Sequence, residues 1–115
     1  MIEKILYDFL SEETWEESGD SIWEYYEIEK KLVDAVKAAD GMCLKFVSPG
    51  MDGMPDRLVL MPGGCMAFVE TKAPGKKPRL LQRYRHMQLR ALGFQVFVVD
   101  APEQIGEVLH AVLPA

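Results

Sequence analysis

The stretch that decides the fold is Pro55-Asp56-Arg57-Leu58-Val59-Leu60-Met61, the turn Pro62-Gly63-Gly64, and Cys65-Met66-Ala67-Phe68-Val69-Glu70-Thr71-Lys72. Two apolar runs of strand length flank the turn, which predicts an antiparallel hairpin. If the turn centres on Gly63, Asp56 lies opposite Glu70. Lys72 then shares the face of Glu70, because side chains alternate along a strand. The hairpin therefore gathers two carboxylates and an ammonium group at one end.

This charged cluster sits at the end of an otherwise apolar hairpin, where charges need a partner or a metal ion. Two neighbouring carboxylates repel each other, and a divalent cation with oxygen ligands relieves that repulsion. The plainer alternative is a strand-end salt bridge between Asp56 and Lys72, although buried ion pairs are poor stabilisers.

Apolar spacing and turn residues predict the elements around the hairpin. They are a helix over 22–39 with Ser21 as its N-cap, a strand over 42–47, loops over 48–55 and 73–78, a helix over 79–92, a strand over 94–99 and a helix over 102–113. The order is that of an α/β domain. The hairpin arms and the last strand are apolar almost throughout, so we expect helices on both faces of the sheet.

The length of 115 residues suits one domain over 22–115, preceded by an acidic extension over 1–21. Residues 1–10 of that extension have apolar residues at helical spacing. No apolar run reaches membrane-spanning length, and no secretory signal is apparent. Cys43 and Cys65 are expected to be buried free thiols, which fits a reducing cytoplasm.

Charge is segregated along the chain. Residues 1–27 hold nine acids and one base, a net charge of −8, whereas the remaining 88 residues have a net charge of +3. Residues 71–90 hold seven bases and no acid. Such a stretch is typical of a surface that binds a polyanion, and its alternative is a solvated helix face.

The motifs in order are Ser48-Pro49-Gly50, Gly53, Pro55-Asp56-Arg57-Leu58, Gly63-Gly64, Phe68-Val69-Glu70-Thr71-Lys72-Ala73-Pro74-Gly75, Pro78-Arg79, Gln82 and Leu92-Gly93-Phe94. From about Glu27 to Val108 this series resembles the VRR-NUC family, the virus-type replication-repair branch of the PD-(D/E)xK nucleases. The resemblance implies a restriction-endonuclease-like αβββαβα core with a mixed central sheet. Stand-alone viral and phage members act as homodimers on branched DNA, and longer relatives carry the domain in repair proteins.

The resemblance also assigns roles to residues. Asp56, Glu70 and Lys72 match the motif, and Gln82 matches the glutamine on the following helix. Glu29 is the best match for the acid on the first core helix, and Glu27 competes with it. The implied cofactor is Mg²⁺, with Mn²⁺ able to substitute.

In this scheme Asp56, Glu70, Glu29 and the Thr71 carbonyl hold the metal, because Mg²⁺ prefers oxygen ligands and keeps several waters. Lys72 orients the attacking water or stabilises the phosphate. Gln82 hydrogen-bonds Lys72 or a metal-bound water, unless it is merely part of an exposed helix surface.

The residues expected to bind DNA are of two kinds. Ser48 and Gly50 lie in a loop whose backbone amides could approach a phosphate, although the same residues are ordinary in turns. The others are cationic side chains that could contact the phosphate backbone: Lys76, Lys77, Arg79, Arg83 and Arg85.

The sequence thus predicts a metal-dependent endonuclease selective for branched DNA such as four-way junctions, acting as a homodimer. A nicking or flap nuclease of the same chemistry is one alternative, and a catalytically silent DNA-binding or assembly module is another. His86 and His110 are expected to be isolated and non-catalytic. Trp15, Trp23, Tyr25 and Tyr26 are expected to pack in the core or at a subunit interface.

Overall fold

The computed structural model describes the backbone of residues 19–113 and the side chains of residues 22–113. Expectations for the helical spacing of residues 1–10 and for Trp15 lie outside this part. The described elements follow the order α, three β, α, β, α, as expected. They are α2 (Gly19–Ala38), β1 (Met42–Lys45), β2 (Arg57–Met61), β3 (Cys65–Thr71), α3 (Leu80–Ala91), β4 (Val96–Val99) and α4 (Ile105–Val112).

The four strands form one mixed sheet in the order β1-β2-β3-β4. β2 pairs with β1 and β3 in antiparallel fashion, and Leu58 lies opposite Phe68. This register confirms a hairpin centred on Gly63, whose φ of 84° suits a residue without a side chain. β4 runs parallel to β3, so the chain must cross over between them, and α3 makes that crossover.

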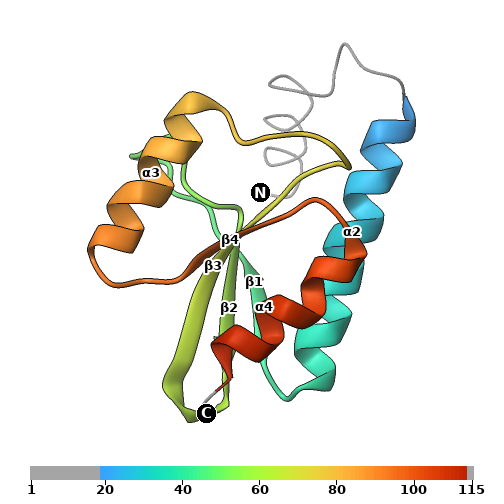
Figure 1. Cartoon of the computed structure of the whole chain (residues 1–115), viewed down its shortest axis with the longest axis vertical. Coiled ribbons are helices and arrows are strands. Elements are labelled where there is room, and N and C mark those ends of the chain that lie inside the picture. Colours follow the sequence, from blue (N-terminus) through green and yellow to red (C-terminus); the bar gives the residue numbers. More distant parts are fainter. Residues whose placement is uncertain (1–18, 114–115) are drawn as a thin grey trace.

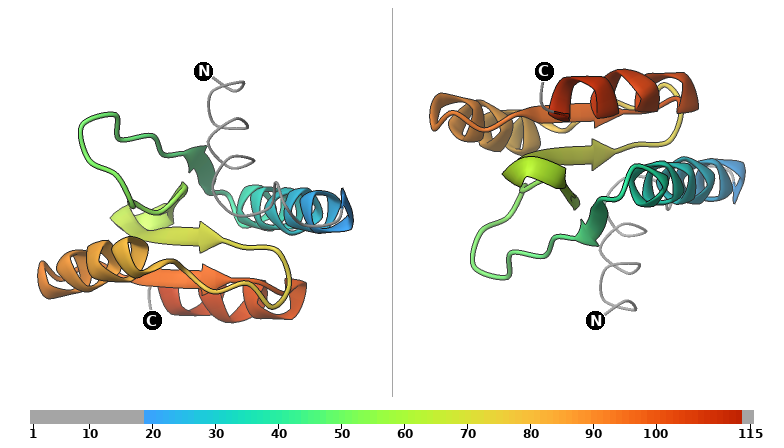
Figure 2. Two further views of the ribbon diagram at one scale, coloured as in Figure 1. Left: turned by 90° about the horizontal axis from the view of Figure 1, so that it is seen from above. Right: turned by 90° about the horizontal axis from the view of Figure 1, so that it is seen from below.

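Helices cover both faces of the sheet, which confirms the expectation from the apolar strands. Viewed along the sheet, α3 lies on one side and α2 and α4 lie on the other (Figure 1). The view from above shows the same two sides (Figure 2). The larger core cluster joins Leu32 and Val36 of α2 to Val59 and Val69 of the sheet. A smaller cluster of Phe68, Leu89 and Val96 fills the α3 side.

Several element ends differ from the sequence expectations for local reasons. α2 begins at Gly19, ahead of the expected cap at Ser21. β1 ends at Lys45, and the next residue, Phe46, donates its N–H to the carbonyl of Asp56 at 2.9 Å, which closes the base of the loop that follows. β4 begins only at Val96, since the N–H of Phe94 bonds back to the carbonyl of Leu89 at the end of α3.

The last expected helix divides into two parts. A 3-10 turn over Pro102–Gln104 precedes α4. The Gln104 side chain accepts the backbone N–H of Asp100 at 2.8 Å and donates to the Asp100 carboxylate at 2.8 Å, which fixes this turn. Within the described residues, no helix combines the length and the apolar character that crossing a membrane requires.

Candidate active site

Asp56 lies immediately before β2, where the hairpin meets the first helix. Its Oδ1 accepts the backbone N–H of Thr71 at 2.9 Å. Its Oδ2 accepts the Thr71 hydroxyl at 2.5 Å and the Tyr25 hydroxyl of α2 at 2.6 Å. The carboxylate is therefore held against the end of β3 by three donors, next to the residue that follows Glu70.

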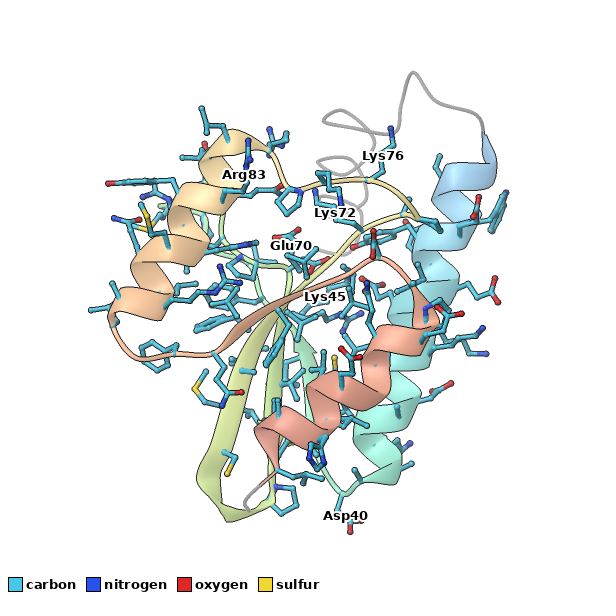
Figure 3. The ribbon with its side chains drawn as sticks, viewed as in Figure 1. Asp40, Lys45, Glu70, Lys72, Lys76 and Arg83 are labelled. Carbon is cyan, nitrogen blue, oxygen red and sulfur yellow. The ribbon has the colours of Figure 1, made fainter. Side chains whose placement is uncertain are left out.

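Glu70 points to the other side of the sheet, towards α3, because it alternates with Val69 and Thr71 along β3. It is only 4% exposed. Its Oε2 lies 3.9 Å from Nζ of Lys72 and accepts the side-chain amide of Gln82 at 3.3 Å. Figure 3 shows Glu70 and Lys72 close together on the side where the loop from β3 to α3 runs. Glu70 and Lys72 are neighbours, as the strand alternation predicted.

Both the oxygen and the nitrogen of the Gln82 side-chain amide form hydrogen bonds. Its Oε1 accepts the backbone N–H of Arg79 at 2.8 Å, at the start of α3, which leaves the NH₂ group facing Glu70. The side chain is buried, so the alternative of an exposed polar helix position is wrong. Its hydrogen-bond partner is Glu70, whereas the sequence suggested Lys72 or a metal-bound water.

Glu29 is buried on α2 among cations. Its Oε2 lies 2.5 Å from Nζ of Lys45 and its Oε1 lies 3.1 Å from the Arg57 guanidinium. Burial alone would raise the pKa of the Glu29 carboxyl, but the Lys45 hydrogen bond and the Arg57 charge hold that pKa below its ordinary value. The competing residue, Glu27, is exposed and pairs with Lys31 at 3.1 Å. Of the two acids, Glu29 is the one that faces the sheet.

The donor chemistry of this site fits Mg²⁺ in part. Asp56, Glu70 and the Thr71 carbonyl are oxygen donors at the end of one hairpin, and Mg²⁺ needs only one or two carboxylates beside water and substrate oxygens. Among the side chains described, those of residues 22–113, however, no three acidic, histidine or cysteine groups gather closely enough to hold a metal ion. The carboxylate of Glu29 is already engaged by Lys45 and Arg57, so its role as a ligand stays a prediction.

Sequence reasoning missed several residues that adjoin these acids. Tyr25 is buried, as expected, and its hydroxyl also contacts Asp56 and lies 3.1 Å from Oε2 of Glu29. The spacing of four residues between Tyr25 and Glu29 was the available signal, since it places both on one helix face. Lys45 and Arg57 are opposite each other across β1 and β2, which only the strand register reveals.

His86 is the other residue that was missed. It was expected to be isolated, but it is 2% exposed and its Nε2 lies 3.5 Å from Oε1 of Glu70. Burial, and then the charges of Arg90 and Lys72, lower the pKa of His86 to about 4, so the imidazole is neutral at pH 7. Its spacing of four residues from Gln82 places both on the same face of α3. His110 is exposed in the last turn of α4.

The basic residues after β3 differ in burial and in the contacts that they make. Arg85 is engaged by the protein itself, because its Nε donates to the carbonyl of Asp52 at 2.8 Å and its Nη1 donates to Gln88 at 2.9 Å. Lys77, Arg79 and Arg83 are exposed, and Lys76 is half-buried. Figure 3 shows Lys76 and Arg83 at the same end of the molecule as Lys72. Lys76, Lys77, Arg79 and Arg83 are called the cationic rim below.

The glycine-containing loop between β1 and β2 lies against α3. Ser48 accepts the N–H of Met51 at 3.1 Å in a turn, and Gly50 is exposed. Gly53 has φ of 85°, and a Cβ there would lie 2.8 Å from Cγ of Leu81. Gly53 therefore permits a close approach of the loop to the helix, and the Arg85–Asp52 hydrogen bond holds it there. Whether Ser48 and Gly50 contact phosphate stays a prediction.

Cys43 and Cys65 are free thiols, as expected, although both are half-buried. Burial is the main reason that the pKa of Cys43 rises to about 11, so its thiol is protonated at neutral pH. Neither thiol belongs to a set of potential metal ligands among the side chains of residues 22–113.

Comparison with known proteins shows the class to which this chain belongs. No family model matches the chain. The chain is similar to "Putative nuclease p44" of Acyrthosiphon pisum secondary endosymbiont phage 1, with 50% identity over 88 residues that cover 76% of this chain and 89% of the phage protein. The fold and this relative define the protein as a nuclease.

A solved structure described as a VRR_NUC domain is also similar. It superposes with a TM-score of 0.72 and 30% sequence identity, over 78% of this chain and 98% of that one. The chain belongs to the VRR-NUC family. The mixed sheet flanked by helices is the fold that the resemblance in the sequence implied.

Proposed function

We propose that the protein is a metal-dependent endonuclease that hydrolyses phosphodiester bonds in DNA. The observation that carries this proposal is the placement of the motif residues at one end of the hairpin: Lys72 lies 3.9 Å from Glu70, and Asp56 is bound to Thr71, the residue between them. Carboxylates that can hold a metal ion and an ammonium group that can stabilise the phosphate are the groups that metal-assisted phosphodiester hydrolysis uses. A bound Mg²⁺ or Mn²⁺ would activate water and offset the charge that develops on the phosphate.

The protein residues divide the remaining work among themselves. Asp56, Glu70 and the Thr71 carbonyl would hold the metal. Lys72 is 5% exposed, and its ammonium group supplies the positive charge that orients the water or stabilises the pentavalent phosphate. Gln82 holds the Glu70 carboxylate through its amide, 3.3 Å away. These groups are pre-positioned by strand and helix backbones, so little reorganisation is needed during reaction.

The cationic rim supports DNA as the substrate. Lys77, Arg79 and Arg83 are exposed, and Lys76 and Arg83 lie at the same end of the molecule as Glu70 and Lys72 (Figure 3). Lysine and arginine contacts to phosphate provide affinity without reading base sequence. We therefore favour selectivity for DNA structure, such as a four-way junction, over selectivity for sequence. Symmetric cutting of a junction needs two paired sites, which a two-fold homodimer supplies.

A cleavage assay tests this function and separates it from its alternatives. Supercoiled plasmid, a flap and a four-way junction are each incubated with the wild type in Mg²⁺, Mn²⁺ or EDTA, with Asp56→Asn as the control. We expect the junction to be cut in both metals, and to stay intact in EDTA or with Asp56→Asn. Cleavage in EDTA contradicts metal dependence. Cleavage of only the plasmid indicates a nicking nuclease, and cleavage of only the flap indicates a flap nuclease. DNA binding without any cleavage indicates a silent module.

A further inference from the structure

The Tyr25 hydroxyl lies at the centre of a buried polar cluster between α2 and the sheet. It is 2.6 Å from Oδ2 of Asp56, 3.1 Å from Oε2 of Glu29 and 3.2 Å from the Thr71 hydroxyl. The side chain is only 4% exposed. A tyrosine hydroxyl carries its proton at neutral pH and can therefore donate a hydrogen bond.

Counting protons shows which carboxylate Tyr25 serves. A phenol carries one hydrogen, so it can donate to Asp56 or to Glu29 but not to both at once. Glu29 already has two cationic partners, Lys45 at 2.5 Å and Arg57 at 3.1 Å. Asp56 lies closer to the phenol, and among the described residues it contacts no cation within ion-pairing distance. The Tyr25 hydroxyl therefore donates its hydrogen bond to Asp56.

The two oxygens of Asp56 are consequently unequal. Oδ2 accepts the hydroxyls of Tyr25 and Thr71, whereas Oδ1 accepts only the backbone N–H of Thr71 within the described part of the chain. A carboxylate oxygen has two lone-pair sites. Oδ2 thus has both sites occupied by donors, and Oδ1 keeps one site available for a cation.

We propose that Tyr25 is a positioning residue for metal binding: its hydroxyl fixes the Asp56 carboxylate and leaves Oδ1 as the metal-binding oxygen. This inference rests on the proposed function. Glu29, Lys45 and Arg57 support the arrangement, since the two cations satisfy Glu29 and leave the Tyr25 proton to Asp56. Groups that hydrogen-bond a metal ligand typically contribute about 10- to 100-fold to metal affinity or activity.

Tyr25→Phe removes the hydroxyl and keeps the ring. We expect it to weaken Mn²⁺ binding to the DNA-free protein by about 10- to 100-fold, measured by calorimetry. In cleavage assays the Mn²⁺ concentration for half-maximal rate should rise by a similar factor, and the rate at saturating Mn²⁺ should stay within a few-fold of wild type. The matched control is Tyr84→Phe, because Tyr84 is half exposed on α3 and far from Asp56 in the sequence. It should leave Mn²⁺ affinity unchanged.

Tyr25→Phe in an Asp56→Asn background tests whether Tyr25 affects Mn²⁺ affinity through Asp56. Tyr25→Phe should cause no further loss of Mn²⁺ affinity there, because the ligand that it positions has gone. A folded Tyr25→Phe protein with wild-type Mn²⁺ affinity overturns the Tyr25 role, provided that Asp56→Asn loses affinity and cleavage. If Asp56→Asn itself binds Mn²⁺ and cleaves normally, the proposed function fails instead.

A second measurement needs no substitution at Tyr25 and covers the case in which Tyr25→Phe does not fold. The wild-type chain is labelled with 3-fluorotyrosine, and the Tyr25 fluorine resonance is assigned by replacing Tyr7, Tyr26 and Tyr84 with Phe in turn. Adding diamagnetic Mg²⁺ should shift the Tyr25 resonance, because its hydrogen-bond acceptor becomes a metal ligand. A Tyr25 resonance that is unchanged at saturating Mg²⁺ overturns the proposal.

Discussion

Nε2 of His86 lies 3.5 Å from Oε1 of Glu70, and both side chains are almost entirely buried between α3 and the sheet. The pKa of this imidazole falls from its ordinary value of 6.5 to about 4. Burial is the main cause, and the positive charges of Arg90 and Lys72 add to it. The native protein therefore keeps His86 neutral under conditions in which the unfolded chain would protonate it.

This relationship predicts how the stability of the metal-free protein depends on pH. Between pH 6.5 and about pH 4 the unfolded state binds a proton at His86 that the native state does not, so acidification favours unfolding. The stabilising contribution is complete above pH 6.5 and is lost as the pH falls towards 4. Denaturant unfolding of wild type and His86→Gln checks this: the wild type should lose stability more steeply over that range. Parallel pH profiles for the two proteins would contradict the shifted pKa.

Removing either motif acid should abolish cleavage, but the cost to the fold should differ with the replacement. Asp56→Ala leaves the buried donors of Tyr25 and Thr71 without their acceptor, at about 1–3 kcal/mol for each unsatisfied group. Asp56→Asn and Glu70→Gln keep the shape of each side chain and should remain closer to wild-type stability. Single-turnover cleavage and thermal unfolding of all three variants test this, and a cleavage-competent Asp56→Asn or Glu70→Gln refutes the assignment.

Lys72 should act on chemistry, and the exposed rim should act on binding. Lys72 is buried 3.9 Å from Glu70, whereas Lys77 and Arg83 are exposed. We expect Lys72→Ala to lower the single-turnover rate strongly while DNA affinity stays within a few-fold. Lys77→Glu and Arg83→Glu should weaken DNA binding and lower its dependence on salt concentration. If Lys72→Ala loses affinity and keeps its rate, the two roles are reversed.

Gly53 should be intolerant of any side chain. It has φ of 85°, and a Cβ would lie 2.8 Å from Cγ of Leu81 and 3.2 Å from the backbone carbon of that residue. Strain and overpacking together should make Gly53→Ala destabilising by about 1–3 kcal/mol. The control is Gly50→Ala in the same loop, where a Cβ would meet nothing within 4 Å. Equal unfolding midpoints for the two variants would show that the loop does not depend on its contact with α3.

Some of the site was predictable because it depends on a local period. The alternation along β3 placed Lys72 beside Glu70, and the hairpin turn set the register that brings Asp56 to the end of β3. The surroundings of these acids were not predictable in the same way. Lys45 meets Arg57 through the pairing of β1 with β2, and His86 meets Glu70 through the packing of α3 on the sheet. Such contacts depend on how separate elements are placed relative to one another, which no single periodic pattern records.

The basic residues within 71–90 also have roles that the sequence alone could not separate. A run of positive residues predicted a polyanion-binding surface, but the run alone could not separate Arg85 from Arg83. The structure separates them, because Arg85 donates to the carbonyl of Asp52 and holds a loop, while Arg83 is exposed. Replacing Arg85 is therefore expected to act through the loop as well as through charge.

Dimer formation is the remaining prediction, and it concerns an exposed aromatic residue. Trp23 on α2 is 73% exposed, which is unusual for a tryptophan and typical of a residue that packs against a partner. Light scattering at micromolar concentration should find a dimer for the wild type and a monomer for Trp23→Glu. The control is Met87→Glu, since Met87 is 59% exposed on α3, on the other side of the sheet. A wild-type monomer refutes the dimer, and dissociation by Met87→Glu alone moves the interface to α3.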